Sequence, residues 1–423
     1  MKQAIYDLVI VGGGASGIMA AVVASRNGAS VALIEKNNRL GEKLRISGGG
    51  RCNITNAEFD LRALLKNYGK AEQFLYSAFT EFGVRDTIDF FEEIGLPIKI
   101  EARKRAFPVS DSASDVVHAL THELHKYNVD IITNTRVTKI NHSKTTIFSI
   151  TCGNRTIKGR NYILASGGTS RPETGSTGDG FNWLEQLGHS VKSPTPSITP
   201  LKSKESWVKK VSGTSVKGAR ITFYCDSIKA FRLDGDILFT HFGISGPIIL
   251  SNAYRVAELL EQGRVTAKID CLPTVDSKDL DARIVELLHQ NGGKQVKNLL
   301  RLIAPEGLAP MVAELTANKI NLDTKAGELG KNDRKTLLDS IKELPLTIEA
   351  LMGVEKAVVA DGGVSLKEID TRTFKSNIID NLYVTGDLLD ITRPSGGYSL
   401  QLCWTSGYIA GNGYTINNER DKA

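Results

Sequence analysis

The chain has 423 residues, which is too long for one simple domain and predicts two or three domains. Hydrophobic residues make up 41% and charged residues 24%, as in ordinary globular proteins, and no apolar run approaches the length of a membrane span. The net charge of +6 suits an anionic cofactor or substrate without requiring nucleic acid. Five scattered cysteines without a C-x-x-C pair argue against a disulfide framework or a zinc ribbon, and favour a cytoplasmic protein.

The first predicted element is an apolar strand over residues 7–11 that runs into glycines and then into a helix. Gly12, Gly14 and Gly17 fit G-x-G-x-x-G in the required setting, with a strand before and a helix after. A pyrophosphate would lie on free N–H groups where this helix begins, at Ala15 and Ser16. The pattern predicts a dinucleotide-binding turn.

A second apolar strand over residues 31–34 ends at Glu35. An acid about 20 residues after the glycines is typical of a carboxylate that binds a ribose hydroxyl, and its charge disfavours a 2′-phosphate. The glycine-rich segment 36–56 is expected to be a functional loop in which Lys43, Arg45 and Arg51 face phosphates. The candidate cofactor residues of this segment are Lys36, Lys43, Ser47, Gly48, Gly49, Arg51, Cys52 and Asn53.

Residues 61–127 are predicted to be mainly helical because apolar residues recur at helical spacing. His118 and His122 lie one turn apart there, but without a carboxylate or cysteine partner they indicate a solvated face, and no metal site is expected. Strands are expected over 129–135 and 136–140. A later strand, 162–166, runs into glycines, as suits a strand whose end reaches the same cofactor. The candidate cofactor residues here are Val137, Ala165, Ser166 and Gly167.

The pattern changes near residue 194, where closely spaced prolines indicate a linker. Strands are predicted over 208–211, 220–225, 227–233, 236–239 and 264–272, followed by helices over 277–343. A basic run over 202–220 is read as a solvated face. His241, in a glycine-rich turn, is a candidate acid–base group, with a structural role at least as well supported.

The first pattern returns near residue 355, with strands over 357–360 and 382–385 and a last helix announced by Gly396. Small residues on one face of that helix would let it approach the first helix closely. The two chain ends are therefore expected to build one domain. The predicted division is 1–193 plus 350–423 for the cofactor domain, 194–275 for a mainly-β module and 276–349 for a helical module.

Three segments in this order, 12–35, 165–168 and 384–387, resemble the FAD-binding domain of the glutathione-reductase type. Segments 46–56, 174–180, 240–247 and 396–401 resemble BaiN-like flavoproteins, which include aminoacetone oxidase and a bile-acid reductase. The resemblance implies an α/β fold, in which a Rossmann-type FAD domain carries a β-barrel-like module and a helical module. Gly386 and Asp387 would lie by the ribityl–phosphate end of FAD. Ser166, Asp387 and Ser399 replace the usual Thr, Glu and Asn, which leaves the substrate open.

The segment 396–401 opens a helix, and the N–H groups of Gly397, Tyr398 and Ser399 are expected to face the N1/C2 edge of the flavin. Tyr398 is a candidate hydrogen-bond donor to substrate, or equally a packed aromatic. Cys52 has no second cysteine nearby in sequence, so a redox role is not favoured.

These features predict an FAD-dependent oxidoreductase that acts on a small or flat organic substrate. A second G-x-G-x-x-G is absent, so either NAD(P)H binds transiently over the flavin and a C=C bond is reduced, or O2 is the acceptor in an amine oxidation. One alternative is an RNA-modifying or RNA-binding flavoprotein, which only the basic run over 202–220 supports. Another is a non-catalytic flavin-binding protein. The sequence leaves the oligomeric state open between monomer and homodimer.

Overall fold

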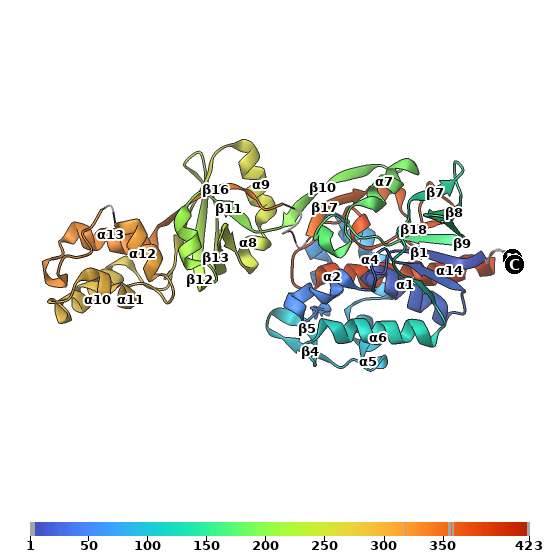
Figure 1. The fold of residues 1–423 in the computed structure, drawn as a ribbon, viewed down its shortest axis with the longest axis horizontal. Coiled ribbons are helices and arrows are strands. Elements are labelled where there is room, and N and C mark those ends of the chain that lie inside the picture. The colour runs from blue at the N-terminus through green and yellow to red at the C-terminus, as the bar shows by residue number, and fades with distance from the viewer. Residues whose placement is uncertain (1–4, 318, 354–356, 358, 421–423) are drawn as a thin grey trace. The chain divides into compact units, whose positions relative to one another are not determined.

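The computed structural model describes residues 5–317, 319–353, 357 and 359–420, and it divides into two compact units (Figure 1). Unit 1 comprises residues 1–195 and 358–423, and unit 2 comprises residues 196–357. Each unit is built around its own hydrophobic core. The two units are described one after the other.

A parallel sheet forms the centre of unit 1, with the order β6-β2-β1-β9 and with β18 added beside β9. Its strands are β1 (Ile5–Val11), β2 (Val31–Ile34), β6 (Asp130–Ile132), β9 (Arg155–Leu164) and β18 (Leu382–Val384). The first half of β9 also pairs antiparallel with β8 (Ile147–Cys152), which pairs with β7 (Lys139–His142). All four residues of β2 are buried, as expected for a parallel strand covered on both faces.

Two helices from opposite ends of the chain pack together in unit 1: α1 (Ala15–Arg26) and α14 (Tyr398–Arg420) (Figure 1). Glycines on α14 permit this approach, because a Cβ on Gly407 would lie 2.4 Å from Ser16 O and one on Gly411 would lie 2.6 Å from Ala20 O. The predicted role of the small residues on the last helix is thus realised against α1. The other helices of unit 1 are α2 (Glu42–Arg45), α3 (Leu61–Leu65), α4 (Glu72–Glu81), α5 (Val84–Glu93), α6 (Ala113–Lys126) and α7 (Asp179–Gln186).

Two smaller sheets complete unit 1. One has the order β3-β5-β4, formed by Thr55–Asn56, Arg105–Pro108 and Ile98–Glu101. This hairpin interrupts the region predicted to be mainly helical, and the sequence analysis missed it because its four-residue strands are too short for a clear period of two. The other sheet pairs β10 (Val191–Ile198) with β17 (Val359–Val364).

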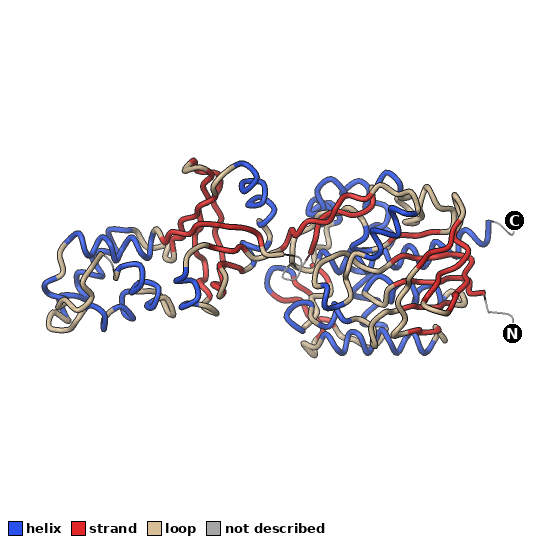
Figure 2. Tube along the Cα trace, turned by 45° about the horizontal axis from the view of Figure 1, so that its top comes forward, coloured by secondary structure: helices blue, strands red, loops and turns tan. Residues whose placement is uncertain are grey.

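Unit 2 contains a closed barrel with the strand order β11-β14-β13-β12-β15-β16. The strands are β11 (Leu201–Ser203), β12 (Ser215–Cys225), β13 (Ile228–Thr240), β14 (Gly243–Ser245), β15 (Val265–Asp270) and β16 (Leu344–Leu351). In β15 the alternate residues Val265, Ala267 and Ile269 are buried, which is the period of two expected for a strand with one face inward. Figure 2 shows the barrel strands in red.

The helices of unit 2 share one hydrophobic core with the barrel. They are α8 (Pro247–Leu250), α9 (Ala253–Gln262), α10 (Ser277–Gln290), α11 (Leu300–Ile303), α12 (Ala309–Thr316) and α13 (Lys331–Lys342). The predicted strand over 208–211 is wrong, because residues Ser206–Val211 form a 3-10 helix that buries Trp207, Val208 and Val211 on one side. The division near residue 275 stays a prediction.

The predicted fold class is confirmed: an α/β unit from both chain ends, with an inserted barrel and helices. Among the described residues, no helix is both long and apolar enough to cross a membrane.

Candidate functional site

The glycine turn after β1 brings three strand ends together. Gly12 has φ +112°, and a Cβ there would lie 2.4 Å from Ala165 O at the end of β9. A Cβ on Gly17 would lie 1.9 Å from Gly12 O, so this glycine lets α1 begin directly against the turn. Thr385, after β18, donates to Ser16 Oγ over 3.2 Å. The carboxyl ends of β1, β9 and β18 therefore meet at the start of α1, where doubly wound folds bind ligands.

Glu35 is buried at the end of β2, where it holds the same turn. Its Oε2 accepts from Gly13 N–H (2.7 Å) and its Oε1 accepts from Asn37 N–H (2.8 Å). Each carboxylate oxygen keeps a lone pair for a further donor, so a ribose hydroxyl fits the site predicted for it. Val137 is buried in the segment between β6 and β7, two residues after Thr135, whose N–H donates to Glu35 O over 2.9 Å.

The glycine turn has the open donors that a dinucleotide requires. A Cβ placed on Gly14 would have no heavy atom within 4 Å, so the backbone there faces open space. Helix α1 begins without a side-chain cap, and the N–H groups of Ala15 and Ser16 have no acceptor among the described residues. After β9, the hydroxyls of Ser166 and Thr169 are buried and have no hydrogen-bond partner among the described residues. These features fit the pyrophosphate of FAD.

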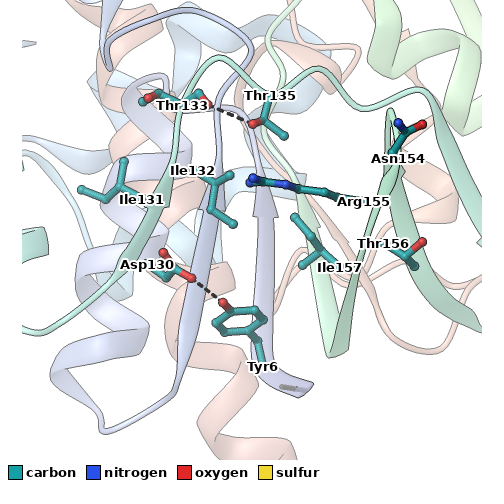
Figure 3. Close-up of a pocket in the computed structure, with 10 residues that line it drawn as sticks. All are labelled: Tyr6, Asp130, Ile131, Ile132, Thr133, Thr135, Asn154, Arg155, Thr156 and Ile157. Atoms are coloured by element: carbon teal, nitrogen blue, oxygen red, sulfur yellow. Dashed lines mark hydrogen bonds between the residues drawn. The ribbon is translucent and has the colours of Figure 1, made fainter. Parts of the chain in front are cut away.

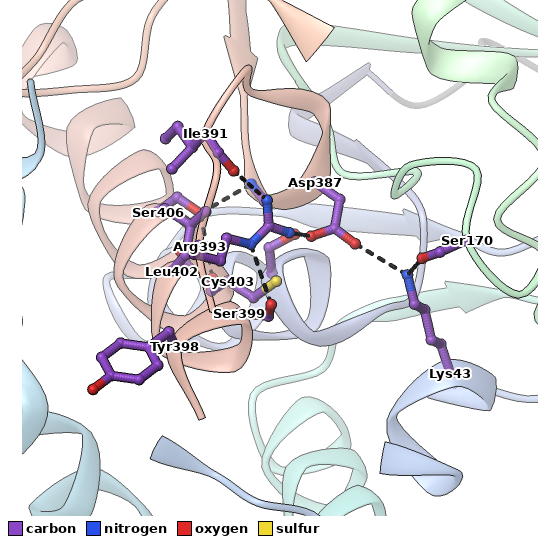
Figure 4. Close-up of polar contacts among 12 residues, drawn as sticks. Lys43, Ser170, Asp387, Ile391, Arg393, Tyr398, Ser399, Leu402, Cys403 and Ser406 are labelled. Atoms are coloured by element: carbon purple, nitrogen blue, oxygen red, sulfur yellow. Dashed lines mark hydrogen bonds and ion pairs between the residues drawn. The ribbon is translucent and has the colours of Figure 1, made fainter. Parts of the chain in front are cut away.

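A cluster of charged residues lies after β18 (Figure 4). Lys43 donates to Asp387 Oδ2 (3.1 Å) and to Ser170 Oγ (2.6 Å), while Arg393 donates to Asp387 Oδ1. Burial alone would raise the pKa of Asp387, but the charges of Lys43 and Arg393 outweigh it and lower that pKa to about 2. Asp387 is therefore a carboxylate at every physiological pH.

The first turn of α14 is fixed by a buried polar network. Gln401 donates from Nε2 to Thr87 Oγ1 (2.8 Å) and Thr405 Oγ1 (3.0 Å), and Thr55 donates to Gln401 Oε1 (2.5 Å). With its amide oriented to satisfy its neighbours, Asn53 accepts from Gly397 N–H over 3.0 Å.

The N–H groups of Gly397, Tyr398 and Ser399 are predicted to face the flavin, but the hydrogen bond to Asn53 occupies one of them. The Gly397 N–H has a partner within the protein, while those of Tyr398 and Ser399 have none among the described residues. A Cβ on Gly397 would lie 2.3 Å from Thr55 C, so this glycine is required by close packing.

The basic residues of segment 36–56 are not equally free to meet phosphates. Arg51 pairs with Glu101 and Asp111 (both 2.5 Å) and lies over the Phe107 ring, so its charge is already compensated. Lys36 pairs with Asp179 (3.0 Å) beside Thr177. Arg45 donates to Ser114 Oγ (3.2 Å).

The rest of this segment is a tight turn around Cys52. Ser47 donates to Leu44 O, while Gly48 and Gly49 adopt φ +56° and +69°. Cys52 is fully buried, and burial raises the pKa of its thiol to about 12. The thiol therefore stays protonated, and the absence of a redox role stays a prediction.

The two candidate catalytic residues lie in different units. Tyr398 is half-buried at the start of α14, and Figure 4 shows its ring pointing away from the Asp387 cluster. Burial, and secondarily the nearby Glu58, raises the pKa of Tyr398, which keeps its phenol protonated. His241 is exposed in unit 2, on the turn after β13, with its ring against Phe242. A catalytic role for either residue stays a prediction.

A polar groove of about 780 Å³ lies elsewhere in unit 1 (Figure 3). Its lining comes from β6, β9 and the start of β1, and includes Tyr6, Asp130 and Arg155. None of the candidate cofactor residues lines this groove. The candidate site is therefore the glycine turn with the two C-terminal segments.

Sequence reasoning missed Arg393 and Ser170 and gave Gln401 no role. Arg393 had one visible signal, since it is an isolated cation shortly before the Gly396–Gly397 pair. Ser170 contacts Lys43 across 127 positions and Gln401 contacts Thr55 across 346 positions, and no local pattern predicts such pairs.

Comparison with known proteins agrees with this geometry. Residues 6–413 match the family described as HI0933-like protein Rossmann domain. The chain is 31% identical to a 3-dehydro-bile acid delta(4,6)-reductase of Clostridium scindens, over 95% of this chain and 97% of that protein. It is also 30% identical to a ribosomal RNA dihydrouridine synthase of Haemophilus influenzae, over 95% and 96%.

Solved structures agree in fold alone. A 3-ketosteroid delta1-dehydrogenase from Sterolibacterium denitrificans has a TM-score of 0.55 at 12% identity, covering 98% of this chain and 100% of that one. A 3-ketosteroid-delta4-(5alpha)-dehydrogenase from Rhodococcus jostii RHA1 has a TM-score of 0.52 at 14% identity, covering 98% of each chain. The family match and the curated relatives carry the assignment: the chain belongs to the HI0933-like Rossmann family and is an FAD-dependent oxidoreductase.

Proposed function

We propose that the protein reduces a C=C bond conjugated with a carbonyl group in a small or flat organic substrate. The observation that carries the proposal is the chemistry shared by the relatives' names. A delta(4,6)-reductase of a 3-dehydro bile acid and a dihydrouridine synthase both saturate a double bond that is conjugated with a carbonyl. Bound FAD supplies the two-electron chemistry, and the protein supplies position and electrostatics.

The residues of the candidate site divide this work. The open N–H groups at Ala15 and Ser16 would hold the pyrophosphate, and Glu35 would hold the ribose. Asp387, kept ionised by Lys43 and Arg393, would accept hydrogen bonds from the ribityl hydroxyls. The other residues proposed to surround FAD are Gly12, Gly14, Gly17, Lys36, Ser47, Gly48, Gly49, Asn53, Val137, Ala165, Ser166, Gly167, Gly386, Gly397, Tyr398 and Ser399. Arg51, which is already paired, and Cys52, which is fully buried, would only shape the loop beside it.

Tyr398 would donate a hydrogen bond or a proton to the substrate. Its phenol has no hydrogen-bond partner among the described residues, and its raised pKa keeps it protonated, so it can donate a hydrogen bond. In a Tyr398→Phe variant, reduction of the flavin by the electron donor should be unchanged, while transfer to the substrate should slow at least tenfold. If Tyr398→Phe matched wild type in the rate of transfer to the substrate as well as in the rate of flavin reduction, Tyr398 would not have this role.

We propose NAD(P)H as the electron donor, because reduction of a C=C bond requires a two-electron donor. It would bind transiently over the flavin, since the sequence holds no second G-x-G-x-x-G turn. The test is an anaerobic titration of the purified yellow protein with NADH and then NADPH, followed by an unsaturated ketone. Bleaching of the flavin by one nucleotide and recovery of colour on adding the ketone are expected. Reduction by an amine instead, with reoxidation in air, would replace this proposal with an amine oxidase. Colourless protein that takes up no FAD would refute both.

A second candidate substrate is a uracil base in RNA, since relatives in Haemophilus influenzae and Escherichia coli carry the dihydrouridine synthase name. Half of the basic run that first suggested RNA is compensated, because Lys202, Lys210 and Arg220 pair with Glu349, Glu314 and Asp234. A salt-dependent shift of ribosomal RNA fragments in a gel would favour this candidate. No shift at low salt would exclude it.

A further inference from the structure

Arg393 is the most deeply buried cation of the candidate site. Its side chain is 1% exposed, and all three of its nitrogens donate to different partners (Figure 4). Nε donates to Ser399 Oγ (3.2 Å), Nη1 donates to Ile391 O (2.6 Å) and Nη2 donates to Asp387 Oδ1. One guanidinium therefore joins the Gly386–Asp387 segment to the first turn of α14, and these are the two C-terminal segments of the proposed flavin site.

The charges around Arg393 do not cancel. Asp387 is shared between Arg393 and Lys43, and among the described residues neither cation pairs with a second carboxylate. The cluster thus holds one positive charge in excess beside a buried guanidinium. The excess charge belongs to Lys43, whose side chain is 28% exposed, while Arg393 is held by Asp387, so the net positive charge of the cluster attracts an anion.

The position of the cluster indicates which anion that is. The pyrophosphate is matched to the N–H groups at the start of α1, where a Cβ on Gly386 would lie 2.9 Å from Ser16 Oγ. Arg393 instead contacts Ser399, whose own N–H is open together with that of Tyr398, at the positive end of the 23-residue helix α14. The positive end of α14 and the guanidinium of Arg393 both attract negative charge, so both would favour negative charge on the ring portion of FAD.

We propose that Arg393 is a positioning residue that locks Asp387 to the first turn of α14 and favours the reduced, negatively charged form of the bound flavin. The proposal rests on the placement of FAD given under the proposed function. Nothing in the family match or in the relatives' names assigns a role to this residue.

The test compares the midpoint potential and the FAD dissociation constant of the holoenzyme in Arg393→Met, Arg393→Lys and wild type. The matched control is Arg26→Met, which breaks another arginine–carboxylate pair (Arg26 to Glu123, 2.5 Å) at the far end of α1. Arg393→Met should weaken the preference for reduced FAD at least tenfold, equal to about 30 mV for a two-electron couple. Arg393→Lys should keep the preference within threefold but bind FAD at least fivefold more weakly, because it loses the three-way contact. Arg26→Met should leave both quantities unchanged.

A preference for reduced FAD that agrees within twofold between Arg393→Met and wild type would overturn the proposal, and so would an equal shift in Arg26→Met. If Arg393→Met does not hold FAD, Ser399→Ala serves instead, because it frees the guanidinium from α14 while keeping the charge. It should shift the preference about threefold in the same direction, and no shift would overturn the proposal. A wild type that fails to bind FAD would refute the proposed function itself, whereas a yellow wild type with unshifted variants would refute only the role of Arg393.

Discussion

The two units differ in the polar groups that they bury. Among the described residues, unit 1 buries the charged side chains Glu35, Glu123, Asp361 and Arg393, whereas the buried polar side chains of unit 2 all belong to serine or threonine. A buried charge needs compensating partners and stabilises a fold poorly, so such groups are retained mainly where binding or catalysis uses them. The buried charges therefore favour unit 1 as the unit that would hold the cofactor, whereas the buried polar side chains of unit 2 are those of a packed scaffold.

Glu123 shows where this comparison needs care. It is buried, yet it pairs with Arg26 and Lys126, and its pKa is lowered because these two cations outweigh the effect of burial. Its charge is thus compensated more than once, far from the glycine turn. The Asp387 cluster differs because its excess charge is positive and lies beside open N–H groups.

The largest expected effect separates packing from binding within the glycine turn. Gly12→Ala should destabilise the protein by about 3 kcal/mol or more, since three backbone atoms would lie within 3.0 Å of the new Cβ at φ +112°. Gly14→Ala should unfold like wild type, because open space surrounds its Cβ, yet should lose at least tenfold in FAD affinity. Thermal unfolding of the apoprotein and FAD titration measure the two effects. If Gly14→Ala bound FAD as tightly as wild type, the pyrophosphate would not bind at this turn.

Asp387→Asn is expected to cost about 3 kcal/mol, because it leaves the buried Arg393 without its carboxylate. The folded pKa of about 2 lies below the usual 3.8, so the contribution of Asp387 is fully present above about pH 4 and is lost as pH falls through 2. That shift corresponds to about 2 kcal/mol. Urea unfolding at pH 5 and pH 2.5 should show this loss in wild type and in Asp89→Asn, an exposed control, but a smaller loss in Asp387→Asn. Equal losses in all three would contradict it.

Cys52→Ala tests whether every buried group in unit 1 serves the chemistry. The thiol is fully buried and its pKa is raised to about 12, so it should contribute packing only, worth about 1 kcal/mol. The rates of flavin reduction and reoxidation should equal those of wild type in stopped-flow measurements. A tenfold loss of either rate in folded Cys52→Ala would give the thiol a catalytic role.

The smallest effect is expected in unit 2. Arg220 pairs with Asp234 on the barrel surface, where an exposed ion pair contributes at most about 0.5 kcal/mol. Arg220→Gln should therefore leave the unfolding midpoint and FAD affinity unchanged. If it weakened binding of an RNA fragment without changing stability, unit 2 would be a binding surface and the comparison between the units would fail.

The sequence by itself determined the elements that depend on local pattern. The strand–glycine–helix unit around Gly12, the acid at Glu35 and the return of the pattern near residue 355 predicted an α/β unit built from both chain ends, and the family match confirms that class. The glycines of this pattern are readable because a close backbone approach or a positive φ favours glycine.

Only the tertiary structure decided which charges remain available. Lys43, Arg45 and Arg51 looked equivalent in sequence, yet Arg51 is compensated by Glu101 and Asp111, 50 and 60 positions away, while Lys43 reaches Asp387 across 344 positions. Arg393 gained its role only when folding buried it between Asp387 and Ser399. The physical reason is that desolvation and pairing depend on neighbours in space, which no local pattern encodes.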